Sequence, residues 1–277
     1  MSNHIKGKSI IVTGAASGFG KLVSQKAAEM GAKLTCADID EKGLEQVVSE
    51  LTEHGLSAQG VVTDVRDAKQ VNALANAAID KFESIDVMVN NAGTMPLAFF
   101  SDHAAALDKW HQCIDINLKG VLNGIAAVHD QMIKQGRGHV VNLSSIYGNA
   151  PVSGSGIYSA TKAAVNYLSE TLRVESAGKI KVTTIRPTGV STNLMDTVVN
   201  PSASIGIMGH NGPAELQRML ELGEAYSDSL DADENSMEYR LIDPAQIADN
   251  IIYAMNQPWG VSISDITVRC SGEIFVL

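Results

Sequence analysis

SIIVTGAASGFG, residues 9–20, decides the fold of this chain. It begins with an apolar run, Ser9–Val12, which predicts a buried strand, and continues into a turn with glycines at positions 14, 18 and 20. We expect a helix from Gly18 to Met30 that ends at Gly31, because glycine accepts the left-handed backbone that follows a helix's last turn. A strand, a glycine-rich turn and a helix in this order are typical of the first unit of a parallel sheet.

The rest of the chain repeats this alternation of short apolar runs and longer segments of helical period. The alternation predicts an α/β fold, because a helical crossover returns the chain to the start of the next parallel strand. We expect a single Rossmann-like, doubly wound domain over residues 1–277, with a seven-stranded parallel sheet and helices on both faces. Further strands are expected at 33–37, 60–62, 87–89, 139–143, 181–185 and 263–268, and further helices at 41–53, 67–82, 108–134, 159–175 and 243–256.

Residues 193–240 depart from this alternation and are rich in Gly, Ser, Met and acidic residues. One helix is expected there, after Gly212-Pro213, at 214–226. An irregular segment of this length is uncommon in a compact domain unless it covers a ligand. We therefore expect 193–240 to be a substrate-loop insertion within the domain, and the sequence leaves open whether it closes as a lid.

Composition narrows the classes of partner. With 45% hydrophobic and 19% charged residues, the chain reads as an ordinary soluble globular protein, and its net charge of −10 argues against binding nucleic acid or an anionic membrane. A small molecule is the expected partner. The three cysteines and seven histidines show no metal-ligand spacing, so no metal is expected. No apolar stretch approaches the ~20 residues of a membrane span, and a cytoplasmic location is expected.

The glycine turn is suited to holding a pyrophosphate. Backbone N–H groups at a helix N-terminus attract negative charge, and glycine lets a ligand approach the backbone closely. The spacing is Gly-x3-Gly-x-Gly, which differs from the common dinucleotide fingerprint, and the fragment alone could also be a tight turn without a ligand. The candidate cofactor-binding residues here are Gly14, Ser17, Gly18, Phe19 and Gly20.

Asp38 stands at the end of the second strand, about 20 residues beyond the glycine turn. A carboxylate there would accept hydrogen bonds from the ribose hydroxyls of an adenosine and would repel a 2′-phosphate. No Lys or Arg stands at Ser17 or Ile39 to neutralise such a phosphate, which favours NAD over NADP. The alternative is that Asp38 only begins a turn, a common role of aspartate.

Tyr158 and Lys162 are four residues apart on an expected helix and therefore share a face. A lysine ammonium near a phenol favours the phenolate and lowers its pKa from ~10, which would suit a general acid or base. By itself this pair could equally be a coincidence of an amphipathic helix.

Taken together, these motifs resemble the short-chain dehydrogenase/reductase family, in its ordinary-length branch, from about residue 5 to the last strand. TGAASGFG (13–20) is similar to the family's TGxxxGxG loop, NNAG (90–93) to its fourth-strand motif, and Tyr158-Ser-Ala-Thr-Lys162 to its YxxxK motif. The resemblance implies that Asn117, Ser145, Tyr158 and Lys162 are the catalytic residues. Asn117 could instead simply interrupt a helix.

The resemblance also implies roles in cofactor and substrate binding. The further cofactor-binding candidates are Ile39, Asp64, Val65, Asn91, Ala92, Gly93, Pro187, Gly189, Val190 and Thr192, together with Tyr158 and Lys162. Thr188 stands where the family commonly has glycine, so its side chain could narrow the pocket or add a hydroxyl to it. The substrate-pocket candidates are Met95, Ile146, Tyr147, Thr188 and Met195.

The function expected from this resemblance is NAD-dependent interconversion of a secondary alcohol and a ketone by hydride transfer, with Tyr158 as general acid and base. Two alternatives stay open: a catalytically silent nucleotide-binding sensor, and an epimerase or dehydratase of the same family. The family's habit of assembly implies a homo-oligomer, with a tetramer favoured.

Overall fold

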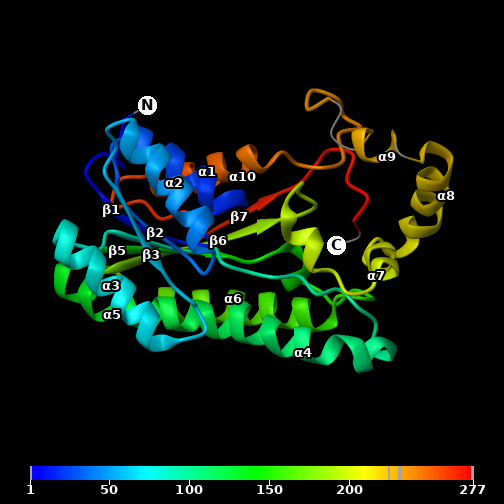
Figure 1. Ribbon diagram of the computed structural model, residues 1–277, viewed down its shortest axis with the longest axis horizontal. Helices are drawn as coiled ribbons and strands as arrows, with labels where there is room; N and C mark the ends of the chain where they lie inside the picture. Colours follow the sequence, from blue (N-terminus) through cyan, green and yellow to red (C-terminus); the bar gives the residue numbers. More distant parts are fainter. Residues whose placement is uncertain (1, 224, 230–232, 276–277) are drawn as a thin grey trace.

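The computed structural model describes residues 2–223, 225–229 and 233–275, and its centre is a seven-stranded sheet (Figure 1). All strand pairs are parallel, in the order β3-β2-β1-β4-β5-β6-β7, which confirms the predicted fold class. The strands are β1 (Ser9–Thr13), β2 (Lys33–Asp38), β3 (Ala58–Val62), β4 (Val87–Asn90), β5 (Gly138–Leu143), β6 (Ile180–Pro187) and β7 (Asp265–Val268).

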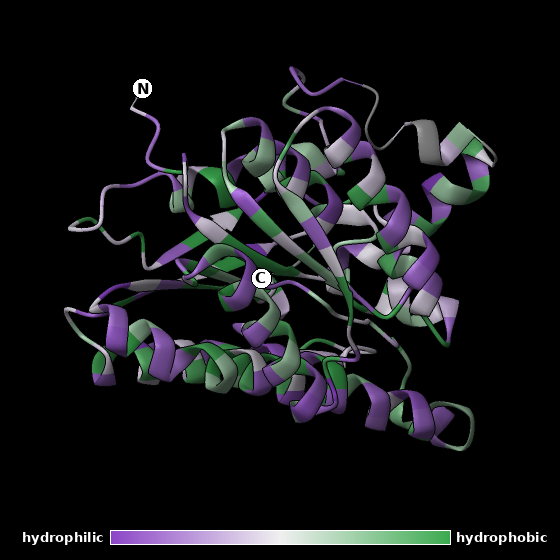
Figure 2. Ribbon diagram, turned by 60° about the vertical axis from the view of Figure 1, so that its left-hand side comes forward, coloured by the Kyte–Doolittle hydropathy of each residue, from purple (hydrophilic) through white to green (hydrophobic). Residues whose placement is uncertain are grey.

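Helices cover both faces of the sheet, as Figure 1 shows. One face carries α1 (Gly18–Glu29), α2 (Glu41–Glu53) and α10 (Pro244–Met255), and the other carries α3 (Ala68–Phe82), α4 (His103–Ile114), α5 (Gly120–Gln135) and α6 (Gly156–Glu175). Side chains alternate across a strand, so Ile10 and Val12 join the core under α1 while Ile11 joins the core under α3 and α5. Figure 2 shows the resulting hydrophobic strands between amphipathic helices.

The strand order places a topological switch at β1, whose neighbours β2 and β4 extend the sheet in opposite directions. In doubly wound sheets the crevice for a ligand opens at the carboxyl ends of the strands beside such a switch. The glycine turn after β1 and the NNAG segment after β4 both lie at this edge.

The helix expected over 108–134 is interrupted in the structure. A single π-helical turn, Asp115–Lys119, separates α4 from α5, and it contains the buried Asn117. Such turns frequently mark functional sites. Sequence periodicity gives no sign of the break, because both flanking helices keep an amphipathic pattern, but the alternative that Asn117 interrupts a helix agrees with it. The helix expected from 159 begins at Gly156 instead, three residues earlier.

The insertion 193–240 contains more helix than predicted: η4 (Asn193–Thr197), α7 (Pro201–Gly206), η5 (Gly209–Asn211), α8 (Gly212–Leu222) and α9 (Ala225–Asp228). Residues 224 and 230–232 of the insertion lie outside the described residues. Glu215, only 5% exposed, accepts hydrogen bonds from the Tyr226 hydroxyl and Arg240, both at 2.8 Å. This contact ties α8 to α9 and to the segment before α10.

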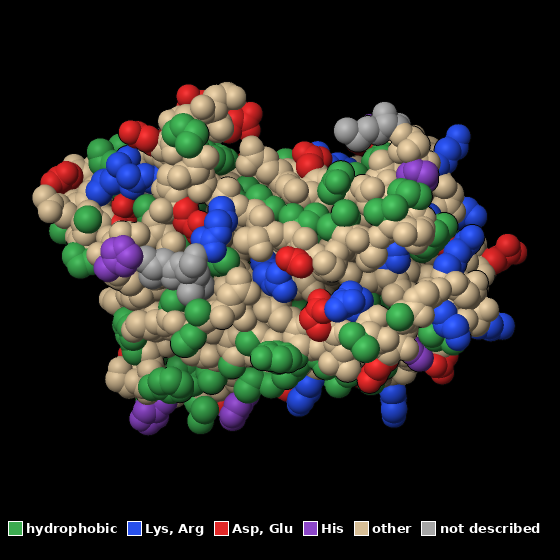
Figure 3. Space-filling model, turned by 180° about the vertical axis from the view of Figure 1, so that it is seen from behind, with side chains coloured by type: hydrophobic (Ala, Val, Ile, Leu, Met, Phe, Trp, Pro, Cys, Tyr) green, Lys and Arg blue, Asp and Glu red, His purple; other side chains and the backbone are tan. Residues whose placement is uncertain are grey.

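Large apolar side chains remain exposed on the outer layer of α4, α5 and α6: Leu107, Leu122, Tyr167 and Val174. Figure 3, which views the molecule from behind, shows apolar side chains gathered along its lower edge. Within the described residues, no helix has both the length and the apolar character needed to cross a membrane.

Candidate active site

A cavity of about 890 Å³ opens at the carboxyl edge of the sheet. This volume lies within the range typical of small-molecule and cofactor sites. The cavity runs from the glycine turn and β2 to the insertion. Most of the candidates from the sequence line it: Gly14, Ser17, Gly18, Phe19, Asp38, Ile39, Asp64, Val65, Asn91, Ala92, Gly93, Met95, Ser145, Tyr147, Tyr158, Lys162, Pro187, Thr188, Gly189, Val190, Thr192 and Met195.

The glycine turn packs too tightly for side chains at two of its positions. A Cβ on Gly14 would lie 2.8 Å from Asn91 Nδ2, and a Cβ on Gly20 would collide with the Gly14 carbonyl. Gly20 does not line the cavity but lets α1 approach the turn. Gly18 has φ of +50° and faces open space, as a position for close ligand approach requires.

The segment after β4 is bonded to the end of β1. Asn91 Nδ2 donates to the carbonyls of Thr13 (2.9 Å) and Gly14 (3.1 Å), and Thr13 Oγ1 accepts from the backbone N–H of Asn91 (3.0 Å). These hydrogen bonds hold the carboxyl ends of β1 and β4 together beside the switch point. They therefore also hold the part of the cavity wall that these two ends form.

The carboxylate of Asp38 accepts hydrogen bonds from backbone N–H groups, one of which belongs to the glycine turn. One carboxylate oxygen accepts from the Ala16 N–H at 2.9 Å and the other from the Asp40 N–H at 3.0 Å. The carboxylate therefore lines the cavity in a fixed position. Ile39, 62% exposed, lies at the outer rim.

A second carboxylate, Asp64, lines the same end and is paired with Arg66 through a contact of 2.6 Å. The bond to Arg66 lowers the pKa of Asp64. Arg66 also lines the cavity, which the sequence did not predict, because positions 17 and 39 are the ones expected to lie beside a 2′-phosphate.

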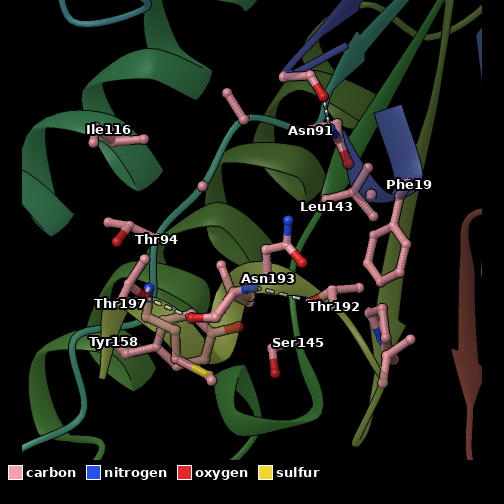
Figure 4. A pocket seen from close by; sticks show the side chains of 18 of the residues that line it. Phe19, Asn91, Thr94, Ile116, Leu143, Ser145, Tyr158, Thr192, Asn193 and Thr197 are labelled. Carbon is pink, nitrogen blue, oxygen red and sulfur yellow. Dashed lines mark hydrogen bonds between the residues drawn. The ribbon is translucent and has the colours of Figure 1, made fainter. Parts of the chain in front are cut away.

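Tyr158 and Ser145 face the cavity near the insertion (Figure 4). Tyr158 is 5% exposed, and burial raises its pKa to about 12, while a hydrogen bond with Ser145 opposes the rise. The sequence predicted a lowered phenol pKa. The pKa is raised instead because the free energy needed to remove the phenolate from water exceeds the stabilisation that the Ser145 hydrogen bond gives to it. At neutral pH the phenol therefore holds its proton.

Lys162 lies one turn further along α6. Its ammonium stands 5.7 Å from the centre of the Tyr158 ring and donates to the Leu143 carbonyl at 2.8 Å. Burial lowers the pKa of Lys162 to about 8. The neighbouring Ser144 donates to the Lys162 carbonyl at 3.0 Å, which ties the end of β5 to α6.

Asn117 does not line the cavity; it is fully buried behind the wall. Its amide exchanges two hydrogen bonds with the backbone of Thr94, at 2.8 and 2.9 Å, and donates to Thr161 Oγ1 at 3.3 Å. The π-helical turn thus joins the segment after β4 to the helix that carries Tyr158.

The segment after β6 forms the wall between the two ends of the cavity. Thr188 lines the cavity, but its Oγ1 is buried and has no hydrogen-bond partner among the described residues, so the hydroxyl is not presented to a ligand. Thr192 accepts from the Leu194 N–H and starts the insertion.

The insertion completes the cavity near Tyr158. Thr197 Oγ1 accepts from the Met95 N–H at 2.8 Å and so attaches η4 to the segment after β4. Figure 4 shows Asn193 and Thr197 beside Ser145 and Tyr158, with Asn91 and Phe19 towards the other end. Ile146, a pocket candidate, instead packs in the adjoining core and does not line the cavity. The sequence missed the lining residues Asn193, Leu194, Thr197, Ile207 and Phe275 because they lie in the irregular insertion or the C-terminal segment.

A family model described as short chain dehydrogenase matches residues 8–202. This chain belongs to the short-chain dehydrogenase family. The match covers the glycine turn, the segment after β4, Asn117, Ser145, Tyr158 and Lys162, and it ends inside the insertion.

Among its relatives, an uncharacterized oxidoreductase of Listeria monocytogenes is 36% identical over 267 residues, 95% of this chain and 96% of the relative. A short-chain dehydrogenase/reductase of Burkholderia phymatum, solved with NAD, has a TM-score of 0.75 at 28% identity. The match covers 96% of this chain and 90% of the Burkholderia chain. An alcohol dehydrogenase of Thermococcus sibiricus, solved with 5-hydroxy-NADP, has a TM-score of 0.76 at 21% identity, and the match covers 96% of this chain and 97% of the dehydrogenase. At this identity the similarity is one of fold alone. These neighbours bind NAD or an NADP derivative, and this chain is an oxidoreductase of their family.

Proposed function

We propose that this chain is an NAD-dependent oxidoreductase that interconverts a secondary alcohol and a ketone, with Tyr158 as the general acid and base. The observation that carries the proposal is that the buried phenol of Tyr158 faces the same cavity as the glycine turn and Asp38. One end of the cavity suits a dinucleotide and the other holds a proton donor.

The residues present fit an NAD cofactor. The turn at the start of α1 leaves open space at Gly18 and offers the N-terminus of a long helix to a pyrophosphate. The fixed carboxylate of Asp38 suits the ribose hydroxyls and disfavours a 2′-phosphate. Gly93, Pro187, Gly189, Val190 and Thr192 would hold the nicotinamide end. When bound, the nicotinamide would supply or take up the hydride.

The side chains of this chain would manage the proton. In the direction of ketone reduction, Ser145 would donate a hydrogen bond to the carbonyl oxygen, and Tyr158 would give that oxygen its proton. The raised pKa of Tyr158 suits this role, since the phenol is protonated before the reaction. Alcohol oxidation would reverse these steps.

Lys162 and Asn117 would support the reacting groups in different ways. Lys162, fixed by Leu143, would stabilise the phenolate left after proton transfer and hold the nicotinamide ribose. Asn117 would keep α6 and the segment after β4 in register, and the resemblance assigns it a water that relays protons from Lys162.

A panel of secondary alcohols with NAD, and of ketones with NADH, tests this proposal through the absorbance of NADH. We expect turnover of some members and a higher kcat/KM with NAD than with NADP. Nucleotide binding without turnover of any alcohol or ketone would instead favour a silent sensor, and conversion without net change in NADH would favour an epimerase or dehydratase.

A further inference from the structure

The C-terminal segment reaches the cavity after the last strand. Gly272 donates its N–H to the Tyr239 carbonyl at 2.9 Å, and a Cβ on Gly272 would lie 2.6 Å from the backbone of Glu238. Asn211 Nδ2 then donates to the Ile274 carbonyl at 3.0 Å. The segment is thus hydrogen-bonded to the middle of the insertion, at Asn211, and to its last residues, at Tyr239, before it reaches Phe275.

Phe275 ends this path inside the wall of the cavity. Its ring packs against Gly189 so closely that a Cβ there would collide with it. Its ring also meets that of Tyr147 edge to face, with centroids 6.1 Å apart and planes at 89°. Tyr147 is 5% exposed and its hydroxyl donates to the Ile207 carbonyl at 3.4 Å, so the partner ring is held as well.

Among the described residues that line the cavity beside this aromatic pair, none is charged except Lys162. Apart from Lys162, the charged residues that line the cavity are Asp38, Asp64 and Arg66, all at the end near the glycine turn. Arg269 and Glu273 precede Phe275, but they pair with each other at 2.7 Å and do not line the cavity. Among the described residues that line this end of the cavity, the buried Lys162 is the one cation that an anionic substrate would meet.

We propose that Phe275, seated on Tyr147 and Gly189, is a specificity-determining residue that limits the size of the apolar group on a neutral ketone or alcohol. This rests on the proposed function for the class of substrate. A packed aromatic side chain in the wall limits the length of a substrate. Among the described lining residues at this end the one cation, Lys162, already donates to the Leu143 carbonyl, which disfavours carboxylates and phosphates.

The test measures kcat/KM with NADH for acetone, acetophenone and acetonaphthone, methyl ketones of increasing size. We expect Phe275→Ala to raise the ratio of acetonaphthone to acetone by about tenfold or more, and Phe275→Leu to raise it less. Met237→Ala removes an exposed apolar side chain outside the cavity and should leave the ratio unchanged. An unchanged ratio in Phe275→Ala would overturn the proposal.

Charge selectivity has its own matched pair, benzoylformate and its methyl ester. The wild-type chain should prefer the neutral ester by about tenfold or more in kcat/KM, and preference for the anion would contradict the proposal.

A binding measurement separates failure of this inference from failure of the proposed function. Acetamide and naphthamide are unreactive analogues of the ketones, and their binding to the chain with NADH can be followed by NADH fluorescence. If no ketone is reduced, Phe275→Ala should still shift binding towards naphthamide by about tenfold. That result would contradict the proposed function but support the role of Phe275 in limiting the size of the ligand. If Phe275→Ala shifts neither the ratio of kcat/KM nor the binding, the proposed role of Phe275 is wrong.

Discussion

At the scale of single residues, burial affects the pKa values of Tyr158 and Lys162 more than their spacing does. The phenol pKa is raised to about 12 and the ammonium pKa is lowered to about 8, both because of burial. A helix position places two side chains on one face, but burial depends on the segments packed over them. Here those segments are the end of β5 and the insertion, which the sequence motif does not contain.

These pKa values predict the pH dependence of the reaction. Alcohol oxidation needs the phenolate, whose fraction rises about tenfold per pH unit below the pKa, so log kcat/KM should rise with a slope near one from pH 6. Above about pH 8 the slope should lessen, because neutral Lys162 stabilises the phenolate less. Initial rates across pH 6–10 check this, and Lys162→Met should lose the change of slope. A rate independent of pH would contradict it.

Asp38 predicts the choice of cofactor. Asp38→Asn keeps the size of the side chain and an acceptor for the Ala16 N–H, but removes the charge that repels a 2′-phosphate. The ratio of kcat/KM for NAD over NADP should fall by about tenfold. If the wild-type chain already prefers NADP, the reasoning from Asp38 is wrong.

At the scale of elements, the sequence predicted the seven strands and most of the long helices, and it missed the π-helical turn and most of the short helices of the insertion. Buried parallel strands stand out in sequence as continuous apolar runs, as positions 87–89 of β4 do. The π-helical turn at Asn117 does not, because the helices on either side keep an amphipathic pattern and the bond of Asn117 to Thr94 joins residues distant in sequence. The short helices of the insertion were not predicted for a related reason. They are stabilised by contacts such as that of Glu215 with Arg240 rather than by a long apolar stripe.

The Glu215 contact should hold the insertion together. Arg240→Met would leave a buried carboxylate without its cation, a change that typically costs about 3–5 kcal/mol. Limited proteolysis should then cut within 193–240 faster. Arg173→Met, which breaks an exposed pair with Glu170, is the matched control and should behave as wild type. Equal cleavage of both variants would show that this contact does not hold the insertion.

At the scale of the whole molecule, the doubly wound order could be predicted because each motif follows a strand in the family's sequence order. The path of the C-terminal segment could not, since it depends on contacts of Phe275 and Gly272 with segments far away in the chain. The cofactor end of the cavity is therefore formed by segments that carry the motifs, whereas the insertion and Phe275 complete the other end.

The chain is expected to assemble with copies of itself. Exposed apolar side chains on α4, α5 and α6 offer a surface for a second copy, and a homotetramer is expected from the family resemblance. Tyr167, 78% exposed on α6, is a suitable probe. Sedimentation should give a tetramer for wild type and smaller species for Tyr167→Glu, because a buried unpaired charge disfavours association. A monomeric wild type would contradict this.

The central claim is that Tyr158 transfers the proton in a reaction whose cofactor binds at the glycine turn. The most direct test compares wild type with Tyr158→Phe, which removes only the hydroxyl, for ketone reduction and for NADH binding measured by fluorescence. We predict that kcat falls at least about a hundredfold while the Kd for NADH stays within about twofold. Retained turnover in Tyr158→Phe would contradict the account.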